Sequence, residues 1–263
     1  MKEKLLVLGI CLFLSTASVG CDLVKDMVVL EGSGNVVTIS EEFTGFNRVE
    51  AGHSFDVEIT QGDEYSIVLR VDENFVDYLD ITKRGNTLDL DLKDSYSYQF
   101  LDGVLEATII MPELLLVRLS GAGDARMTGF DSNSRFEAVL SGSSSLTGDL
   151  GAGDVVADVS GASELSGRYM VGDINLTTSG ASIIQLSGSG SSLVVDASGN
   201  STANLEEFAT GDAKVDVSGA SEVVLNASGT VDVSANGASK VYQTGSGDFG
   251  DMDSSGASRI NRK

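Results

Sequence analysis

The sequence contains little of several residue types that mark other classes of protein. It has one proline and no tryptophan in 263 residues, and aromatic residues make up only 6%. Its 31 glycines do not recur at every third position, so the composition excludes a collagen and also differs from a proline-rich disordered chain. Because 41% of the residues are hydrophobic, the chain can bury a core, and that core must consist mainly of valine, leucine, isoleucine and alanine.

Positive charge and histidine are scarce as well. The 17 Lys and Arg residues stand against 39 Asp and Glu residues, which gives a formal net charge of −22. Such a surface repels phosphate groups, so nucleic acid is not expected as a partner. The single histidine, His53, excludes an ordinary zinc site in a chain with so few cysteines. We interpret His53 as a polar residue within a strand.

The N-terminal segment has the pattern of an export signal. Lys2 and Lys4 precede an apolar run of about ten residues, which is too short to span a bilayer, and small residues follow it up to Cys21. The segment Ser18-Val19-Gly20-Cys21 resembles the lipobox of bacterial lipoproteins, although Ser18 replaces the usual leucine. We therefore expect a signal peptide over residues 1–20, lipidation of Cys21 and anchoring in the cell envelope, at the outer membrane. The alternative is an ordinary cleaved signal with a chance cysteine.

Beyond a lipidated tether expected over residues 21–42, residues 43–116 show the alternation of β-strands. Apolar side chains occupy every second position at Phe55, Val57 and Ile59, and again at Leu88, Leu90 and Leu92. A period of two indicates strands with one buried face. Residues 43–116 are therefore predicted to form an N-terminal β region.

From residue 117 to residue 263 the sequence repeats itself. A Ser-Gly-Ala-Ser motif recurs eight times at intervals of 18 to 21 residues, with its glycines at Gly121, Gly142, Gly161, Gly180, Gly199, Gly219, Gly237 and Gly256. A constant period near 20 is typical of a solenoid. The repeat predicts an all-β parallel β-helix of about eight coils of about 19 residues, which the N-terminal β region continues or caps. A flat two-sheet sandwich, the alternative, would not require this self-similarity.

These repeats resemble a bacterial family described as putative auto-transporter adhesin, head GIN domain. The resemblance rests on the eightfold motif, on Gly172-Asp173-Ile174-Asn175 within one repeat, and on Phe55-Asp56-Val57-Glu58-Ile59-Thr60-Gln61-Gly62 upstream. It covers nearly all of the chain after Cys21. The resemblance implies a β-helix on a secreted or lipid-anchored protein, and it brings no catalytic residues.

Motifs for catalysis are missing or lack their structural context. There is no Gly-x-Ser-x-Gly nucleophile elbow to accompany His53. The segment Gly245 to Gly250 matches a dinucleotide-binding pattern, but no helical pattern follows it. The repeats are rich in aspartate and poor in the lysine and arginine that a polysaccharide lyase needs as a base. We therefore expect a protein that is not an enzyme.

Two groups of residues are candidates for binding. Tyr96, Tyr98 and Phe100 alternate along one expected strand, so they share a face that can contact a glycan or a protein partner, or pack on the core. Asp196 and Asp216 hold equivalent positions in neighbouring repeats, three residues before the motif glycine. They form either a weak calcium site or an ordinary solvated face; no other cofactor is expected.

The sequence thus predicts a non-catalytic lipoprotein of the cell envelope that presents a β-helix surface for adhesion or envelope-associated binding. Its expected partners are the membrane, through the N-terminal lipid, and a glycan or protein ligand. The alternatives are a carbohydrate-binding or polysaccharide-degrading β-helix protein and a structural spacer of the envelope.

Overall fold

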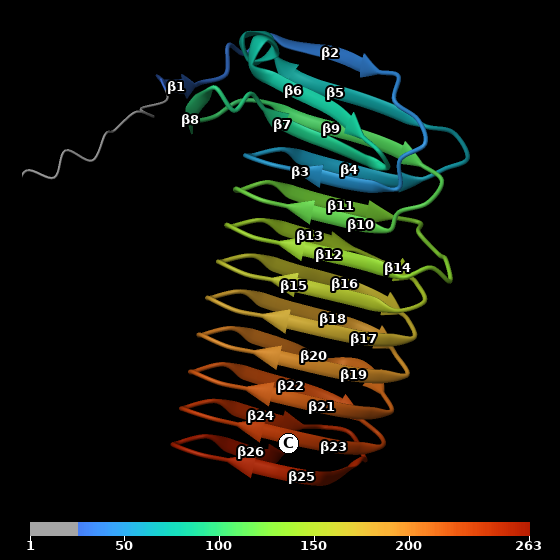
Figure 1. The fold of residues 1–263 in the computed structure, drawn as a ribbon, viewed down its shortest axis with the longest axis vertical. Helices are drawn as coiled ribbons and strands as arrows, with labels where there is room; N and C mark the ends of the chain where they lie inside the picture. The colour runs from blue at the N-terminus through green and yellow to red at the C-terminus, as the bar shows by residue number, and fades with distance from the viewer. Residues whose placement is uncertain (1–25) are drawn as a thin grey trace, which may run out of the picture.

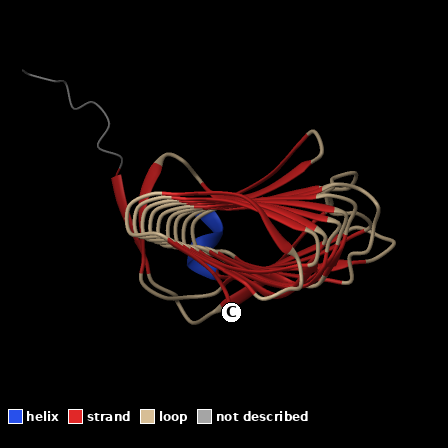
Figure 2. Ribbon diagram, turned by 90° about the horizontal axis from the view of Figure 1, so that it is seen from below, coloured by secondary structure: helices blue, strands red, loops and turns tan. Residues whose placement is uncertain are grey.

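The computed structural model of the chain describes residues 26–263. Its strands form two long sheets of 11 and 13 strands and a separate ribbon of two strands. Figure 1 shows a tall stack of coils, and Figure 2, which looks along the stack, shows the two sheets facing each other. Their inner side chains form one continuous hydrophobic core. No helix within residues 26–263 has the length and apolar character to cross a membrane. The predicted all-β solenoid is confirmed.

Eight coils form the repeat region, as predicted. Each coil contributes one strand to the 11-stranded sheet and one to the 13-stranded sheet, and each strand pairs in parallel with its equivalent in the next coil. The coils are β10 (Leu116–Leu119) with β11 (Asp124–Thr128), β12 (Phe136–Leu140) with β13 (Ser145–Gly148) and β14 (Leu150–Gly151), β15 (Val155–Val159) with β16 (Glu164–Met170), β17 (Asp173–Thr178) with β18 (Ile183–Ser189), β19 (Ser192–Ala197) with β20 (Thr202–Thr210), β21 (Asp212–Val217) with β22 (Glu222–Ala227), β23 (Thr230–Ala235) with β24 (Lys240–Gln243), and β25 (Asp248–Ser254) with β26 (Arg259–Arg262).

The motif glycine forms the corner between the two strands of each coil. All eight corner glycines have a positive φ, between 73° and 86°, which side chains disfavour. Space excludes a side chain as well, because a Cβ at Gly180 would lie 2.5 Å from the carbonyl oxygen of Gly161 in the preceding coil. That same oxygen accepts a hydrogen bond from the N–H of Ala181 at 2.7 Å. Close stacking of the corners therefore requires glycine.

The last serine of the motif lies inside the corner. Six of these serines are buried, namely Ser144, Ser163, Ser182, Ser201, Ser221 and Ser239. The hydroxyl of Ser201 donates to the carbonyl oxygen of Ser198 at 2.9 Å. In the same way, the hydroxyl of Ser239 donates to the carbonyl oxygen of Asn236 at 2.8 Å. These bonds satisfy corner carbonyl groups that the strand ladders leave free. The repeat thus conveys both the bend and its hydrogen bonding.

Residues 43–116 both continue the solenoid and cap it. Strands β3 (Arg48–Ala51) and β4 (Asp56–Gln61) form a further coil that pairs in parallel with β10 and β11. On its other side β7 (Thr87–Leu92) and β9 (Leu105–Met111) also pair in parallel. The coil of β3 and β4 therefore lies between two layers whose strands come later in the sequence.

Antiparallel strands close this end of the stack. Strands β5 (Ser66–Asp72) and β2 (Val36–Glu41) extend the 13-stranded sheet beyond β9, and β6 (Leu79–Arg84) extends the 11-stranded sheet beyond β7. The short 3₁₀ helix η1 (Glu73–Tyr78) joins β5 to β6 and buries Phe75. The reversal of strand direction ends the parallel ladder, and we call this part the capped end.

The expected tether over residues 21–42 is wrong for its described part. Strand β1 (Asp26–Leu30) pairs in parallel with β8 (Tyr96–Phe100), and β2 pairs with β5. Alternation in both segments is weak in the sequence. Their partner strands lie about 30 to 70 residues away, so the sequence does not reveal the pairing either. The folded domain therefore includes residues 26–42.

Replacing a corner glycine tests the stacking constraint. We expect Gly180→Ala to lower the free energy of unfolding by about 3 kcal/mol or more, because positive φ costs ~1 kcal/mol and the clash with Gly161 adds to it. Gly45→Ala is the matched control, since Gly45 has a φ of 70° but no atom within 4 Å of the added Cβ; it should cost ~1 kcal/mol. Equal losses in urea unfolding would refute the close-approach explanation.

Candidate functional site

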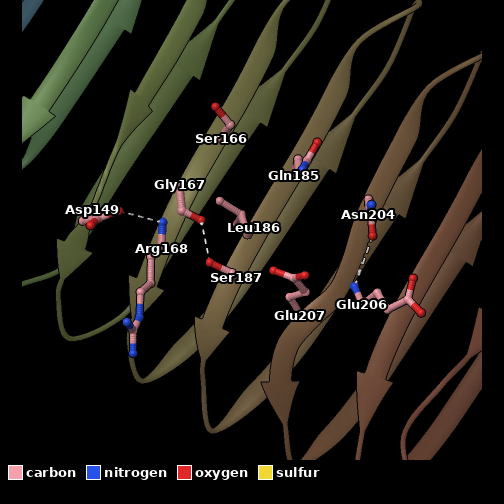
Figure 3. Close-up of a pocket in the computed structure, with 10 residues that line it drawn as sticks. All are labelled: Asp149, Ser166, Gly167, Arg168, Gln185, Leu186, Ser187, Asn204, Glu206 and Glu207. Carbon is pink, nitrogen blue, oxygen red and sulfur yellow. Dashed lines mark hydrogen bonds between the residues drawn. The ribbon is translucent and has the colours of Figure 1, made fainter.

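A polar groove of about 330 Å³ lies on the outer face of the 13-stranded sheet, across β16, β18 and β20 (Figure 3). Strand pairing arranges its side chains in two rows. The first row is Ser166, Gln185 and Asn204, and the second is Arg168, Ser187 and Glu207. Neighbours in a row are one strand apart, which is about 4.8 Å, and the rows are about 6.6 Å apart on β16 and β18. The groove therefore presents hydroxyl, amide and charged groups as a regular array.

A break in the alternation of β20 creates one wall of the groove. Leu205 and Phe208 are both buried, while Glu206 and Glu207 between them are both exposed. Two outward residues in succession force a bulge, and the register between β20 and β22 shifts there. In the neighbouring strands Gly167 of β16 and Gly188 of β18 have positive φ, although the pairing of β16 with β18 continues without a register shift. The groove thus lies at a local departure from the regular ladder of the 13-stranded sheet.

Some charged side chains at the groove form ion pairs and others do not. Glu206 forms an ion pair with Lys263 at 2.7 Å, and its N–H donates to the side-chain oxygen of Asn204 at 3.3 Å. By contrast, the ion pairs found within residues 26–263 include neither Arg168 nor Glu207. Both side chains and that of Gln185 are exposed. Three adjacent strands therefore present to solvent a cationic side chain (Arg168), a neutral amide (Gln185) and an anionic side chain (Glu207).

The predicted aromatic strip packs largely inward. Tyr96, Tyr98 and Phe100 share one face of β8, as expected, and all three are half-buried. Phe100 lies 5.4 Å from Phe75, ring centre to ring centre, and Tyr98 lies 6.0 Å from Tyr78. Burial raises the pKa of Tyr98 to about 12, with neighbouring tyrosines and aspartates adding to the effect. The strip therefore joins β8 to η1, and only parts of its rings remain accessible.

His53 lies at a corner and not within a strand, so its interpretation as a strand residue is wrong. It aligns with the corner glycine of the next coil, Gly121, and is the one non-glycine residue with positive φ, 55°, within residues 26–263. Its Nδ1 lies 2.5 Å from the carboxylate of Asp91. Burial raises the pKa of Asp91, but hydrogen bonds from His53 and from the Leu92 N–H outweigh it and lower the pKa overall. This pair ties the first corner to β7.

Comparison with known proteins establishes the family. The model of the family described as "Putative auto-transporter adhesin, head GIN domain" matches residues 45–247. The chain belongs to this family. A search among curated proteins finds no match.

Solved structures share the fold of this head GIN domain. One from Parabacteroides distasonis, named a "putative lipid binding protein", has a TM-score of 0.82 at 19% identity and covers 90% of this chain and 100% of its own. Another, from Parabacteroides merdae, named a "putative adhesin", has a TM-score of 0.82 at 14% identity, with coverage of 90% and 99%. A second Parabacteroides distasonis "putative adhesin" has a TM-score of 0.77 at 14% identity, with coverage of 90% and 100%. At these identities the likeness shows the fold alone.

Two further sites are predicted from the sequence, the lipidation site at Cys21 and the aspartate pair of Asp196 and Asp216. Cys21 falls outside the described residues. Asp196 and Asp216 are paired across β19 and β21 on the outer face of the 11-stranded sheet, as the repeat predicts. No group of three or more His, Cys, Asp or Glu side chains within residues 26–263 has the arrangement of a metal site. The predicted calcium site therefore consists of two carboxylates about 4.8 Å apart at the backbone.

Thermal unfolding tests this aspartate pair in the head GIN domain. Millimolar Ca²⁺ should raise the melting temperature of the wild type relative to chelator at constant ionic strength, because a cation that binds only the folded state stabilises it. The rise should vanish in the Asp196→Asn, Asp216→Asn double mutant. If Ca²⁺ has no effect on the wild type, or an equal effect on the mutant, the pair is an ordinary solvated face.

Proposed function

We propose that this head GIN domain is a non-catalytic, lipid-anchored protein of the cell envelope, at the outer membrane, that binds an extracellular ligand through the polar groove across β16, β18 and β20. The observation that carries the proposal is the bulge at Glu206 and Glu207, where a regular solenoid departs from its ladder and exposes a polar array. An adhesin needs such a surface at a distance from its anchor, and a rigid stack supplies it.

The chemistry of the groove favours a ligand rich in hydroxyl or amide groups. Gln185 and Asn204 each offer a donor and an acceptor, Arg168 offers a planar set of donors, and Glu207 accepts hydrogen bonds. A glycan or an extended peptide can satisfy these groups. The acyl chain of a lipid cannot, so the groove itself does not support the lipid-binding activity in the name of one Parabacteroides relative.

A polysaccharide-degrading enzyme and a structural spacer are the competing functions. The carboxylates of Asp149 and Glu207 and the side chain of Arg168 all line the groove, which gives the enzyme hypothesis its one specific observation. Release of sugar products, especially unsaturated ones, by the pure protein would overturn the non-catalytic proposal. A spacer would need no exposed array at all, so ligand retention separates it from an adhesin.

The lipid anchor has a direct test in cells. Replacing the predicted acylation site, Cys21→Ser, should release the mature chain from the membrane fraction or leave it with an uncleaved signal, because stable attachment needs the acyl chains. Fractionation and the mass of the N-terminal peptide report the result. A wild-type chain that is soluble and carries no lipid mass would refute the anchor.

Glycan-array retention tests the groove. In the Gln185→Ala, Asn204→Ala double mutant we expect retention to fall at least ~10-fold, because each lost hydrogen bond contributes about 1 kcal/mol. Asn261→Ala is the matched control: this exposed amide on β26 extends the same row of outward positions beyond the groove.

The predicted aromatic site on β8 is the alternative binding site that the same experiment tests. If the groove mutant retains the ligand and the Tyr96→Ala, Tyr98→Ala, Phe100→Ala triple mutant loses it, binding occurs at β8 and the groove proposal is wrong. The triple mutant should melt at a lower temperature, since Phe100 packs on the core cluster that contains Phe75. Retention is therefore compared at a temperature at which the melting curves show both mutants to be folded.

A further inference from the structure

The ribbon of β1 and β8 has an exposed apolar outer face. Met27 is 72% exposed, Val29 is 53% exposed and Leu101, directly after β8, is 54% exposed. These are three of the nine large hydrophobic side chains that are exposed within residues 26–263. Parallel pairing sets Met27 beside Ser97 and Val29 beside Gln99, so the outer face combines apolar and neutral polar residues. The outward positions within the two strands, Met27, Val29, Ser97 and Gln99, carry no charge in a chain whose net charge is −22, and the exposed Glu31 follows at the end of the ribbon beside Leu101.

The inner face of the ribbon is held firmly. Leu30 is buried in a small cluster with Phe75 and Leu92, and Val28, Tyr98 and Phe100 pack against this cluster. The N–H of Leu101 donates to the carbonyl oxygen of Leu30 at 2.9 Å, which extends the pairing beyond β8. The apolar outer face is therefore built on a fixed support, and it does not arise from a loose chain end.

The position of the ribbon relates it to the proposed anchor. β1 lies beside the stack at the capped end (Figure 1). Met27 follows Cys21 by six positions in the sequence, so a fully extended chain spans at most about 21 Å between them. If lipid holds Cys21 in the bilayer, Met27 stays within that distance of it and Val29, two positions further on, stays within about 28 Å. At such distances the high effective concentration of the apolar face favours even a weak contact with the bilayer.

We infer that the outer face of the β1–β8 ribbon docks on the membrane that holds the anchor, with Met27, Val29 and Leu101 entering the headgroup region. The inference rests on the proposed lipid anchor at Cys21. Its chemistry fits a bilayer better than a partner protein, because the outward strand positions are apolar or neutral and lie next to the anchor, while Glu31 at the end of the ribbon can remain among the headgroups. The bilayer surface must be largely zwitterionic, since the acidic chain is repelled by anionic lipid.

Tryptophan fluorescence tests this contact, because the native chain contains no tryptophan. The mature chain carrying Val29→Trp is coupled through its only thiol, Cys21, to a maleimide lipid in phosphatidylcholine–phosphatidylethanolamine vesicles. Lipids brominated near the headgroup should quench the emission at least twofold and leave it shifted to the blue. Val194→Trp is the matched control, since Val194 is an exposed valine on β19, far from the ribbon, and its emission should not change.

The outcomes separate the ribbon from the anchor. Quenching of Val29→Trp no greater than that of Val194→Trp, repeated with Leu101→Trp, would overturn the inference while leaving acylation of Cys21 intact. A blue shift that appears without vesicles and grows with protein concentration would assign the face to a second copy and overturn it too. Lack of lipid mass on Cys21 from cells would refute the anchor, and this measurement is independent of the chemically coupled assay.

Discussion

The approach of one corner to the next is the constraint on which the fold depends. At each corner the Cα of a glycine lies against the carbonyl oxygen of the corner in the preceding coil, and a Cβ there would lie 2.3 to 2.7 Å from it. This contact brings the hydrogen-bonding N–H of the next residue into reach and sets the register of both sheets. The columns of buried valine, leucine and alanine follow from that register, because a shift by one residue would expose all of them.

The first coil shows what happens where the constraint is relaxed. His53 takes the place of the corner glycine, keeps its left-handed backbone and bonds to Asp91 with its ring. Here the neighbouring layer is β7, which reaches its position after an excursion through β5 and η1. The side chain has room at this corner because no earlier corner of the repeat type lies against it. At the start of the solenoid, His53 therefore links its own coil to β7, a strand that comes about 35 residues later in the sequence.

The sequence predicted the coils well because their information is local and repeated. Gly180 and Ser182 recur with equivalents in the other coils, so each position is observed many times. The N-terminal layers were predicted only as strands, since the pairing of β2 with β5 or β1 with β8 depends on contacts between distant segments. The aromatic strip had the right period, but its packing on η1 depended on a helix of one or two turns.

The groove could have been found from the sequence by one signal. Leu205-Glu206-Glu207-Phe208 sets two carboxylates between two apolar residues, which no regular strand can accommodate with both apolar side chains inside. Reading the repeat as uniform concealed this exception. The array of Ser166, Gln185 and Asn204, by contrast, becomes meaningful only when the strands are placed side by side, because each residue alone is an ordinary outward position.

Interchangeable coils also have an evolutionary consequence. Because each coil contacts only its two neighbours, recombination within the gene can duplicate or delete one repeat without disturbing the others. Duplication or deletion of a coil between the groove and the capped end would move the groove by one strand spacing, about 4.8 Å, relative to that end. The reach of the protein is thus a quantity that can change in discrete steps, independently of the residues that recognise the ligand.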